Sequence, residues 1–277
     1  PCSAKGALFI IVVNWCYQYV IRQRALNILN SQPSQKRFLI HMPTGTGKTK
    51  TATHIICHYY NYSLRKRGLI IWIAHTKELL QQAYDTFKSV WKNIGNGDII
   101  EYKLWGNYEP DLAESNFSGL VVCGIQKLQS IMSNKPEFFE KLRENVRLIV
   151  YDEAHKAIAK ETKTVVDSLM NWRGGLTDRS LMGLTATPGR TFDYSADNNI
   201  LVSMFGNKII EVDTKLMNMI NLSKQEAANV EIETDIIKYF QGRGVLAKIE
   251  KEELIYQDSF TETELNNLKI EMSDNGY

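Results

Sequence analysis

Two short stretches of this chain carry residues suited to phosphate chemistry. Residues 42–49 read Met-Pro-Thr-Gly-Thr-Gly-Lys-Thr, and residues 152–155 read Asp-Glu-Ala-His. Glycines let a loop turn several backbone N–H groups onto phosphate oxygens, and a lysine at its end can reach the outer phosphates. Two adjacent carboxylates can share the tasks of holding magnesium and aligning a water. Together the stretches predict binding and hydrolysis of a nucleoside triphosphate.

The first stretch is a candidate phosphate loop between a strand and a helix. An apolar run at 37–41 precedes it, and a helix can open at Lys48. The pattern G-x-x-x-x-G-K-[ST] is met except at its first position, where Met42 replaces glycine. Lys48 is expected to reach the β- and γ-phosphates, and the Thr49 hydroxyl to bind magnesium. The expected nucleotide-binding residues are Pro43, Thr44, Gly45, Thr46, Gly47, Lys48 and Thr49.

The second stretch follows an apolar run at 148–151, which suits a buried strand. Ligands bind at the carboxyl ends of parallel strands, where this run delivers Asp152 and Glu153. An isolated Asp-Glu pair is usually a solvated turn, but the preceding strand favours a catalytic site. Asp152 is expected to hold magnesium and Glu153 to orient or deprotonate the attacking water, so the expected catalytic set is Lys48, Asp152 and Glu153.

Apolar runs alternate with helix-like segments along most of the chain. This alternation predicts an α/β fold with a mostly parallel sheet and helices on both faces. The expected strands are 37–41, 69–74, 119–123, 148–152 and 181–184, with further candidates at 99–104 and 209–212. The expected helices are 78–92, 137–145 and 157–171, besides the one that opens at Lys48.

The chain divides into three expected regions. Residues 1–30 form an N-terminal segment, 31–215 the nucleotide-binding lobe, and 216–277 a polar linker or the start of an accessory domain. The last region predicts a small α+β extension. Its expected elements are a helix at 230–240, a hairpin from 245–247 and 254–256, and a capping box at 261–264 that opens a terminal helix.

Composition excludes some classes of protein. The net charge is +2, so any groove for nucleic acid must be a local feature. The four cysteines show no C-x-x-C spacing, which argues against a zinc site or a disulfide framework and favours a reducing compartment, cytoplasmic or nucleoid-associated. The apolar run at 7–13 is too short to span a bilayer, so it is expected to form a buried strand or helix, and no membrane partner is expected.

Three further segments accompany the phosphate loop and the Asp-Glu-Ala-His stretch. They are Ile73-Ala74-His75-Thr76-Lys77-Glu78-Leu79, Val121-Val122-Cys123-Gly124-Ile125-Gln126-Lys127-Leu128 and Gly183-Leu184-Thr185-Ala186-Thr187-Pro188. Over 37–191 the ordered set resembles the superfamily 2 helicases and translocases of the DEAD/DEAH type, especially the restriction, repair and defence members. The resemblance implies the first RecA-like P-loop NTPase lobe of such a motor, using ATP and Mg²⁺ and acting on nucleic acid, with DNA favoured over RNA.

The resemblance also implies roles for single residues. Loops at two strand ends would contact the nucleic-acid backbone, and their side chains are of the donor types that phosphate contacts need. Cys123 replaces a threonine found in many relatives, so no hydroxyl contact is expected there. The expected nucleic-acid contacts are His75, Thr76, Lys77, Gln126 and Lys127, and the expected coupling residues are His155, Thr185 and Thr187.

A glutamine before the phosphate loop is expected to read adenine. Gln23 has the family's spacing from Lys48 and is favoured, whereas Gln18 follows an aromatic residue, Tyr17, as in the family motif, and remains the alternative.

Superfamily 2 motors bind ATP between two RecA-like lobes, and the stretch after residue 215 is too short for a second one. Motifs of that lobe are absent from the sequence, and Gln241-Gly242-Arg243-Gly244 has the wrong spacing for an arginine-finger motif. We therefore expect a first lobe with little activity alone, completed by a second lobe in cis or in trans and by partner subunits of a larger complex. The alternatives are an ATP-driven clamp or remodeller that does not unwind, and a non-catalytic scaffold lobe.

Overall fold

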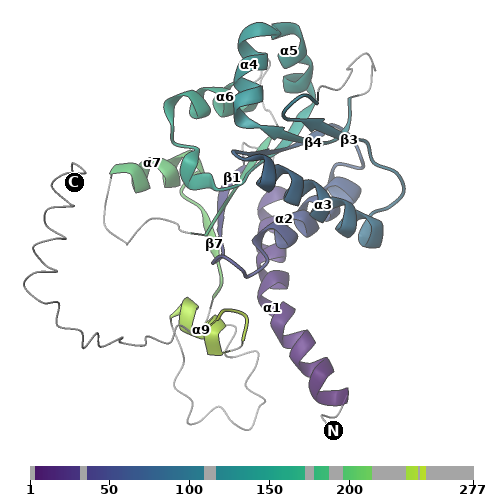
Figure 1. The fold of residues 1–277 in the computed structure, drawn as a ribbon, viewed down its shortest axis with the longest axis vertical. Coiled ribbons are helices and arrows are strands. Elements are labelled where there is room, and N and C mark those ends of the chain that lie inside the picture. Colours follow the sequence, from purple (N-terminus) through teal and green to yellow (C-terminus); the bar gives the residue numbers. More distant parts are fainter. Residues whose placement is uncertain are drawn as a thin grey trace, which may run out of the picture. The chain divides into compact units, whose positions relative to one another are not determined.

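A computed structural model describes residues 4–31, 36–108, 117–171, 178–186, 196–213, 235–242 and 244–247, without the side chains of 4–16 and 196–198 (Figure 1). The chain separates into a compact unit, Pro1–Leu246, and a second unit from Ala247 onward. The second unit lies outside the described residues apart from Ala247.

A seven-stranded sheet forms the centre of the compact unit, and every neighbouring pair of strands is parallel. The strand order is β3-β4-β2-β5-β6-β1-β7. Each apolar run expected to be a strand is one, which confirms the predicted sheet. The strands are β1 (Lys36–His41), β2 (Leu69–Ala74), β3 (Glu101–Leu104), β4 (Gly119–Gly124), β5 (Val146–Tyr151), β6 (Ser180–Thr185) and β7 (Ile209–Glu211).

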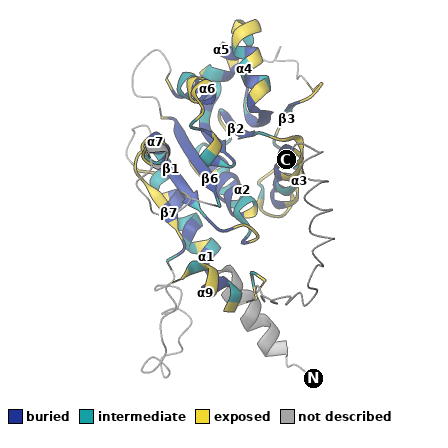
Figure 2. Cartoon of the chain, turned by 60° about the vertical axis from the view of Figure 1, so that its left-hand side comes forward, coloured by how far each residue is buried: buried dark blue, intermediate teal, exposed yellow. Residues whose placement is uncertain are grey.

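Helices cover both faces of the sheet, as expected. The helices are α1 (Ala4–Leu29), α2 (Lys48–His58), α3 (Lys77–Ile94), α4 (Ile125–Asn134), α5 (Pro136–Asn145), α6 (Lys160–Met170), α7 (Ala196–Met204) and α9 (Ile236–Gly242), with short turns η1 (Tyr59–Ser63) and η2 (Ala154–Lys156). One buried cluster joins α1, α2 and α3 to alternate residues of β1 and β2, and a second joins α4, α5, α6 and α7 to the others. The strands lie buried between these layers (Figure 2).

The structure adds detail to three local expectations. The apolar run at 7–13, expected to be a strand or a helix, lies in the 26-residue helix α1. Gln126 and Lys127 lie in the first turn of α4, a helix that the sequence did not predict, and not in a loop. Thr76 is the N-cap of α3, with its hydroxyl oxygen accepting a hydrogen bond from the Leu79 amide at 3.4 Å. No helix within the described ranges is long and apolar enough to cross a bilayer.

The expected boundary at residue 215 also changes, because the compact unit continues to Leu246. Tyr239 and Phe240 of α9 are buried in the cluster of α1, and the Phe240 ring meets the Tyr17 ring edge-on at 4.9 Å. The helix expected at 230–240 is described from Ile236 and ends at Gly242. Val245 and Leu246 pack on the same cluster without forming a strand, and the rest of the expected extension lies outside the described residues.

Candidate nucleotide and nucleic-acid site

Three adjacent strand ends carry the residues expected to bind the triphosphate. The phosphate loop follows β1, Asp152 follows β5, and Thr185 ends β6, which lies between those two strands. Parallel strands bring their carboxyl ends to one edge of a sheet, which is where ligands bind in folds of this type. The sheet order therefore assembles one site from segments far apart in sequence.

The phosphate loop is held in a tight turn. Gly45 and Gly47 both have φ of +82°, a conformation that glycine adopts without steric cost. The Thr46 hydroxyl donates a hydrogen bond of 2.7 Å to the Pro43 carbonyl. Gly47 is the N-cap of α2, so the loop ends at a helix N-terminus, whose N–H groups and dipole favour an anion.

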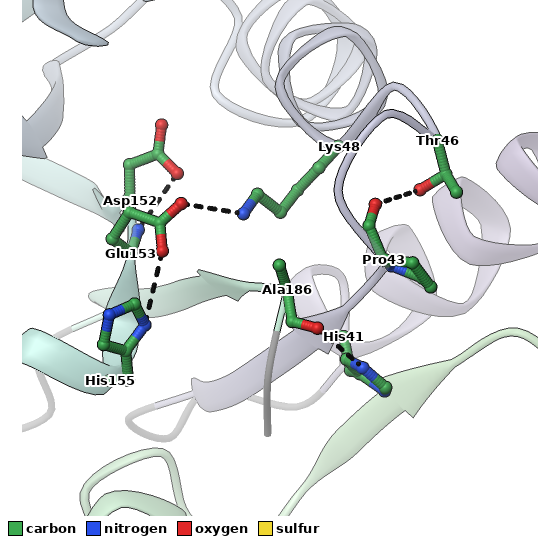
Figure 3. Close-up of polar contacts among 8 residues, drawn as sticks. All are labelled: His41, Pro43, Thr46, Lys48, Asp152, Glu153, His155 and Ala186. Carbon is green, nitrogen blue, oxygen red and sulfur yellow. Dashed lines mark hydrogen bonds and ion pairs between the residues drawn. The ribbon is translucent and has the colours of Figure 1, made fainter. Parts of the chain in front are cut away.

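Lys48 meets the carboxylates, as expected from the sequence. Its Nζ lies 3.2 Å from Glu153 Oε1, and Figure 3 shows the side chain reaching from the loop to the end of β5. The Glu153 amide donates a 3.0 Å hydrogen bond to Asp152 Oδ1. Glu153 has φ of +53°, an unfavourable conformation for a residue other than glycine. Such strain concentrates at functional sites because the surrounding structure must hold it in place.

Asp152 is a buried carboxyl group, with only 3% of its surface exposed. Burial raises its pKa above the usual range, and the positive charge of Lys48 opposes that rise. A buried carboxylate gains from a nearby cation, and carboxylate oxygens are the type of donor that Mg²⁺ prefers. The chemistry of the Asp152 side chain therefore fits a magnesium ligand.

Two histidines line the same end of the sheet. His155 Nδ1 lies 3.3 Å from Glu153 Oε2, and burial lowers the pKa of its imidazole against the pull of Glu153. His41, which the sequence did not single out, ends β1, and its Nε2 lies 3.2 Å from the Ala186 carbonyl. The sequence could have pointed to His41, because it is the last residue before the phosphate loop. A low pKa leaves both rings neutral at pH 7.

Thr185 is fully buried at the end of β6, and its carbonyl accepts a 3.0 Å hydrogen bond from the Met42 amide. This bond ties the end of β6 directly to the start of the phosphate loop. Thr187, the other threonine expected to take part in coupling, lies outside the described residues.

The glutamine that reaches the phosphate loop is Gln18. Its Nε2 donates to the Thr46 carbonyl at 3.0 Å, and the Tyr17 hydroxyl donates to the same oxygen at 2.7 Å. Among the described residues, Gln23 makes no hydrogen bond to the loop. Five residues along a helix rotate a side chain by about 140° to another face, so Gln18 and Gln23 cannot occupy the same place. Spacing alone favoured Gln23 because it ignored the helix face.

A cavity of about 180 Å³ lies beside Gln18 between α1 and α2. Its lining comprises Gln18, Tyr19, Arg22, Thr51 and His54. A Cβ on Gly47 would lie 2.5 Å from Gln18 Nε2, so the loop and the glutamine are in close contact. The cavity is therefore adjacent to the phosphate loop.

The expected nucleic-acid contacts occupy two neighbouring strand ends on the same edge. Thr76 and Lys77 follow β2, Gln126 and Lys127 follow β4, and β2 pairs with β4. The side chains of Thr76, Lys77 and Gln126 are exposed. His75 is different, because its Nε2 is hydrogen-bonded at 2.8 Å to the hydroxyl of Tyr151, a residue that the sequence did not single out. The ends of β4 and β2, which carry these donors, thus lie next to the ends of β5, β6 and β1, which carry the residues expected to bind the triphosphate.

Comparisons with known proteins agree with this geometry. A family model described as "Type III restriction enzyme, res subunit" matches residues 16–190. The ATP-dependent DNA helicase MPH1 of Pyricularia oryzae is 25% identical over 177 residues, 64% of this chain and 15% of that protein. The EcoAI endonuclease subunit of a type I restriction enzyme from Escherichia coli is 30% identical over 170 residues, 58% of this chain and 18% of that protein.

Among solved structures, the Hef helicase domain of Pyrococcus furiosus has the same fold. The TM-score is 0.51 at 23% identity, covering 70% of this chain and 36% of that domain. The chain thus spans a small part of the relatives that it matches and about a third of the similar structure.

Proposed function

Because this chain belongs to the family described as the res subunit of type III restriction enzymes and has the N-terminal lobe of a superfamily 2 helicase, we propose that it is the ATP-binding lobe of a DNA helicase or translocase. The observation that carries the proposal is the 3.2 Å contact between Lys48 at the phosphate loop and Glu153 beside Asp152. A cation, a metal-binding carboxylate and a candidate base at one strand edge are the parts that phosphoryl transfer needs.

The residues divide the chemistry among them. Lys48 would exchange Glu153 for the β- and γ-phosphates, whose combined negative charge exceeds that of one carboxylate. Glu153 would then be available to orient the attacking water, with His155 Nδ1 lying 3.3 Å from its other oxygen. Thr49 and Asp152 would hold Mg²⁺, which neutralises charge on phosphate oxygens when bound.

We assign adenine recognition to Gln18 and the cavity beside it. A glutamine amide can both donate to and accept from a purine edge, and the cavity opens next to the loop that would hold the phosphates. The Thr46 carbonyl oxygen accepts hydrogen bonds from both Gln18 and Tyr17. A base bound by Gln18 would therefore be connected to the phosphate loop through the hydrogen bond of Gln18 to this oxygen.

The proposed polymer is DNA. Two relatives support it by name, one a DNA helicase and the other a restriction endonuclease subunit. The exposed donors of Thr76, Lys77 and Gln126 suit phosphate contacts, which position a nucleic acid without reading its sequence. Completion of the motor requires a second RecA-like lobe in cis or in trans, and partner subunits suit the restriction-type relatives.

A binding experiment tests the nucleotide site. We expect this chain to bind a fluorescent ATP analogue with Mg²⁺, and Lys48→Ala to weaken binding by about a hundredfold, roughly 2.8 kcal/mol. Lys92→Ala removes an exposed lysine at the end of α3 and should leave the affinity unchanged. Glu153→Gln should bind the analogue and, in a protein with both lobes, trap ATP without turnover. Equal affinity of Lys48→Ala and the wild type would refute the site.

The activity requires a separate test in a protein that carries both lobes. Strand displacement and triplex displacement distinguish unwinding from translocation along a duplex. ATP hydrolysis without either movement would identify a clamp or remodeller instead. Normal ATP turnover by Glu153→Gln would contradict the catalytic assignment.

A further inference from the structure

The edge strand β3 ends beside the expected nucleic-acid contacts. A turn of Trp105 to Tyr108 follows β3, which pairs with β4. A Cβ on Gly106 would lie 3.9 Å from Lys77 Cε, and one on Gly124 would lie 3.9 Å from Trp105 Cβ and 3.8 Å from Gln126 Oε1. The turn therefore borders the donors at the ends of both β2 and β4.

An aromatic cluster around Lys103 holds this turn. The Lys103 ammonium lies 4.2 Å from the ring centre of Tyr84, 5.5 Å from that of Trp105 and 5.3 Å from that of Tyr108. The Trp105 and Tyr108 rings meet edge-on at 5.8 Å, and the Tyr108 amide donates to the Trp105 carbonyl at 3.1 Å. Each cation–π contact of this kind contributes a modest stabilisation, and together the contacts hold the rings in a fixed orientation.

Tyr108 differs from its neighbours because its ring is open to solvent. It is 56% exposed, whereas Trp105 is 6% exposed. A ring already held by Lys103 loses little conformational freedom on binding. Nucleic-acid bases stack on such rings regardless of sequence.

The charges around the cluster favour a base over a phosphate at this point. Glu101 and Asp85 lie at the Tyr84 end, where burial and these carboxylates raise the pKa of Tyr84 to about 12. Lys77 borders the turn on the other side, with Glu78 next to it in sequence. A phosphate chain running along the whole cluster would approach carboxylates, whereas an uncharged base on Tyr108 would not.

We propose that Tyr108 stacks on one unpaired base of a single-stranded DNA whose phosphates contact the ends of β2 and β4. Lys103 is a positioning residue that holds the ring through the aromatic cluster. This inference rests on the proposed function and extends its DNA path to the edge strand of the sheet.

Binding of a fluorescein-labelled oligothymidine to this chain, followed by anisotropy, tests the proposal. Tyr108→Ala should weaken binding about tenfold, within the range measured for base stacking. Tyr108→Phe keeps the ring and should bind as the wild type does. Tyr62→Ala removes a tyrosine that is 65% exposed on η1 and should leave binding unchanged. Lys103→Met should weaken binding by less than Tyr108→Ala, with thermal unfolding confirming that each variant folds.

An abasic oligonucleotide separates stacking from backbone contact. The wild type and Tyr108→Ala should bind it equally, since the stacked base is missing. A loss of affinity in Tyr108→Ala that is the same for abasic and normal DNA would overturn stacking in favour of a backbone contact. If Tyr108→Ala binds DNA as tightly as the wild type while Lys77→Ala binds it more weakly, stacking on Tyr108 is overturned and the proposed DNA contacts stand. No DNA binding by the wild-type chain, or none lost in Lys77→Ala, would overturn the proposed DNA contacts themselves.

Discussion

The hydroxyl of Tyr151 and Nε2 of His75 lie 2.8 Å apart in a hydrogen bond that joins the end of β5 to the residue after β2. Tyr151 ends β5 and directly precedes Asp152, whereas His75 follows β2 among the expected nucleic-acid contacts. Charges of Lys156, His155 and Glu153 also act on the His75 ring, whose pKa is lowered mainly by burial. A movement at this end of β2 would therefore pass through the bond to Tyr151, the residue before Asp152.

We expect Tyr151→Phe to uncouple the two regions. The ring remains to fill its buried position, but the hydrogen bond to His75 is lost. In a protein with both lobes, binding of Mg·ATP should be unchanged, while stimulation of ATP hydrolysis by single-stranded DNA should fall about tenfold, the change that 1.4 kcal/mol of lost coupling produces. ATP turnover with and without DNA measures this. Tyr59→Phe, another buried tyrosine, is the control, and undiminished stimulation in Tyr151→Phe would contradict the coupling.

Asp152→Asn should stabilise the fold while abolishing hydrolysis. Burial raises the folded-state pKa of Asp152 above its ordinary value of 3.8, so the folded protein holds the proton more tightly than the unfolded chain. Stability of the wild type therefore falls as pH rises from about 3.8 through the folded pKa. The asparagine side chain of the variant does not titrate. The gain in folding stability over the wild type should therefore be greatest at neutral and alkaline pH and vanish in acid.

Thermal unfolding without magnesium measures that difference, and each kcal/mol corresponds to about 2–4 °C in Tm for a domain of this size. Addition of Mg²⁺ with an ATP analogue should raise the Tm of the wild type and not that of Asp152→Asn. A lower Tm for Asp152→Asn than for the wild type at pH 8 would contradict this prediction, because it would show that neighbouring groups fully offset the cost of burying the Asp152 carboxylate.

Gln18→Ala should weaken binding of an ATP analogue about tenfold, because it removes a polar contact of roughly 1–2 kcal/mol beside the cavity. Gln23→Ala is a matched control on the same helix and should have no effect. Selectivity for ATP over GTP should fall in Gln18→Ala alone, and competition binding with both nucleotides measures it. Weaker binding in Gln23→Ala instead would restore the assignment that spacing favoured.

Phe240→Ala should destabilise the compact unit by about 3–5 kcal/mol, the usual cost of emptying a buried aromatic position. Phe240 is fully buried against Tyr17, whose hydroxyl bonds to the phosphate loop, so affinity for the ATP analogue should fall as well. Ile237→Ala, an exposed position on the same helix, should change stability by no more than about 0.5 kcal/mol. Equal denaturant midpoints for Phe240→Ala and the wild type would show that α9 does not belong to the unit.

Several features of the fold were predictable because their causes are local. Strands β2 and β4 are continuous apolar runs, as buried parallel strands require, and the phosphate loop is marked by two glycines at positive φ. Other features were not. Gln126 and Lys127 looked like loop residues because a strand precedes them, but helix α4 begins at Ile125, directly after β4, with no loop between the two elements. The boundary at residue 215 ignored the later burial of Tyr239 and Phe240.

The sequence by itself determined the strands and the residue types of the two motifs, since both depend on neighbouring residues along the chain. Tertiary structure alone decided which distant residues meet: Lys48 with Glu153, 105 positions apart, Tyr17 with Phe240, and His75 with Tyr151. It also placed Gln18, and not Gln23, against the phosphate loop, because the face that a helix turns toward the loop depends on how the helix packs. Strand order and helix packing arise from burial of apolar surface between elements, a non-local balance that no short pattern encodes.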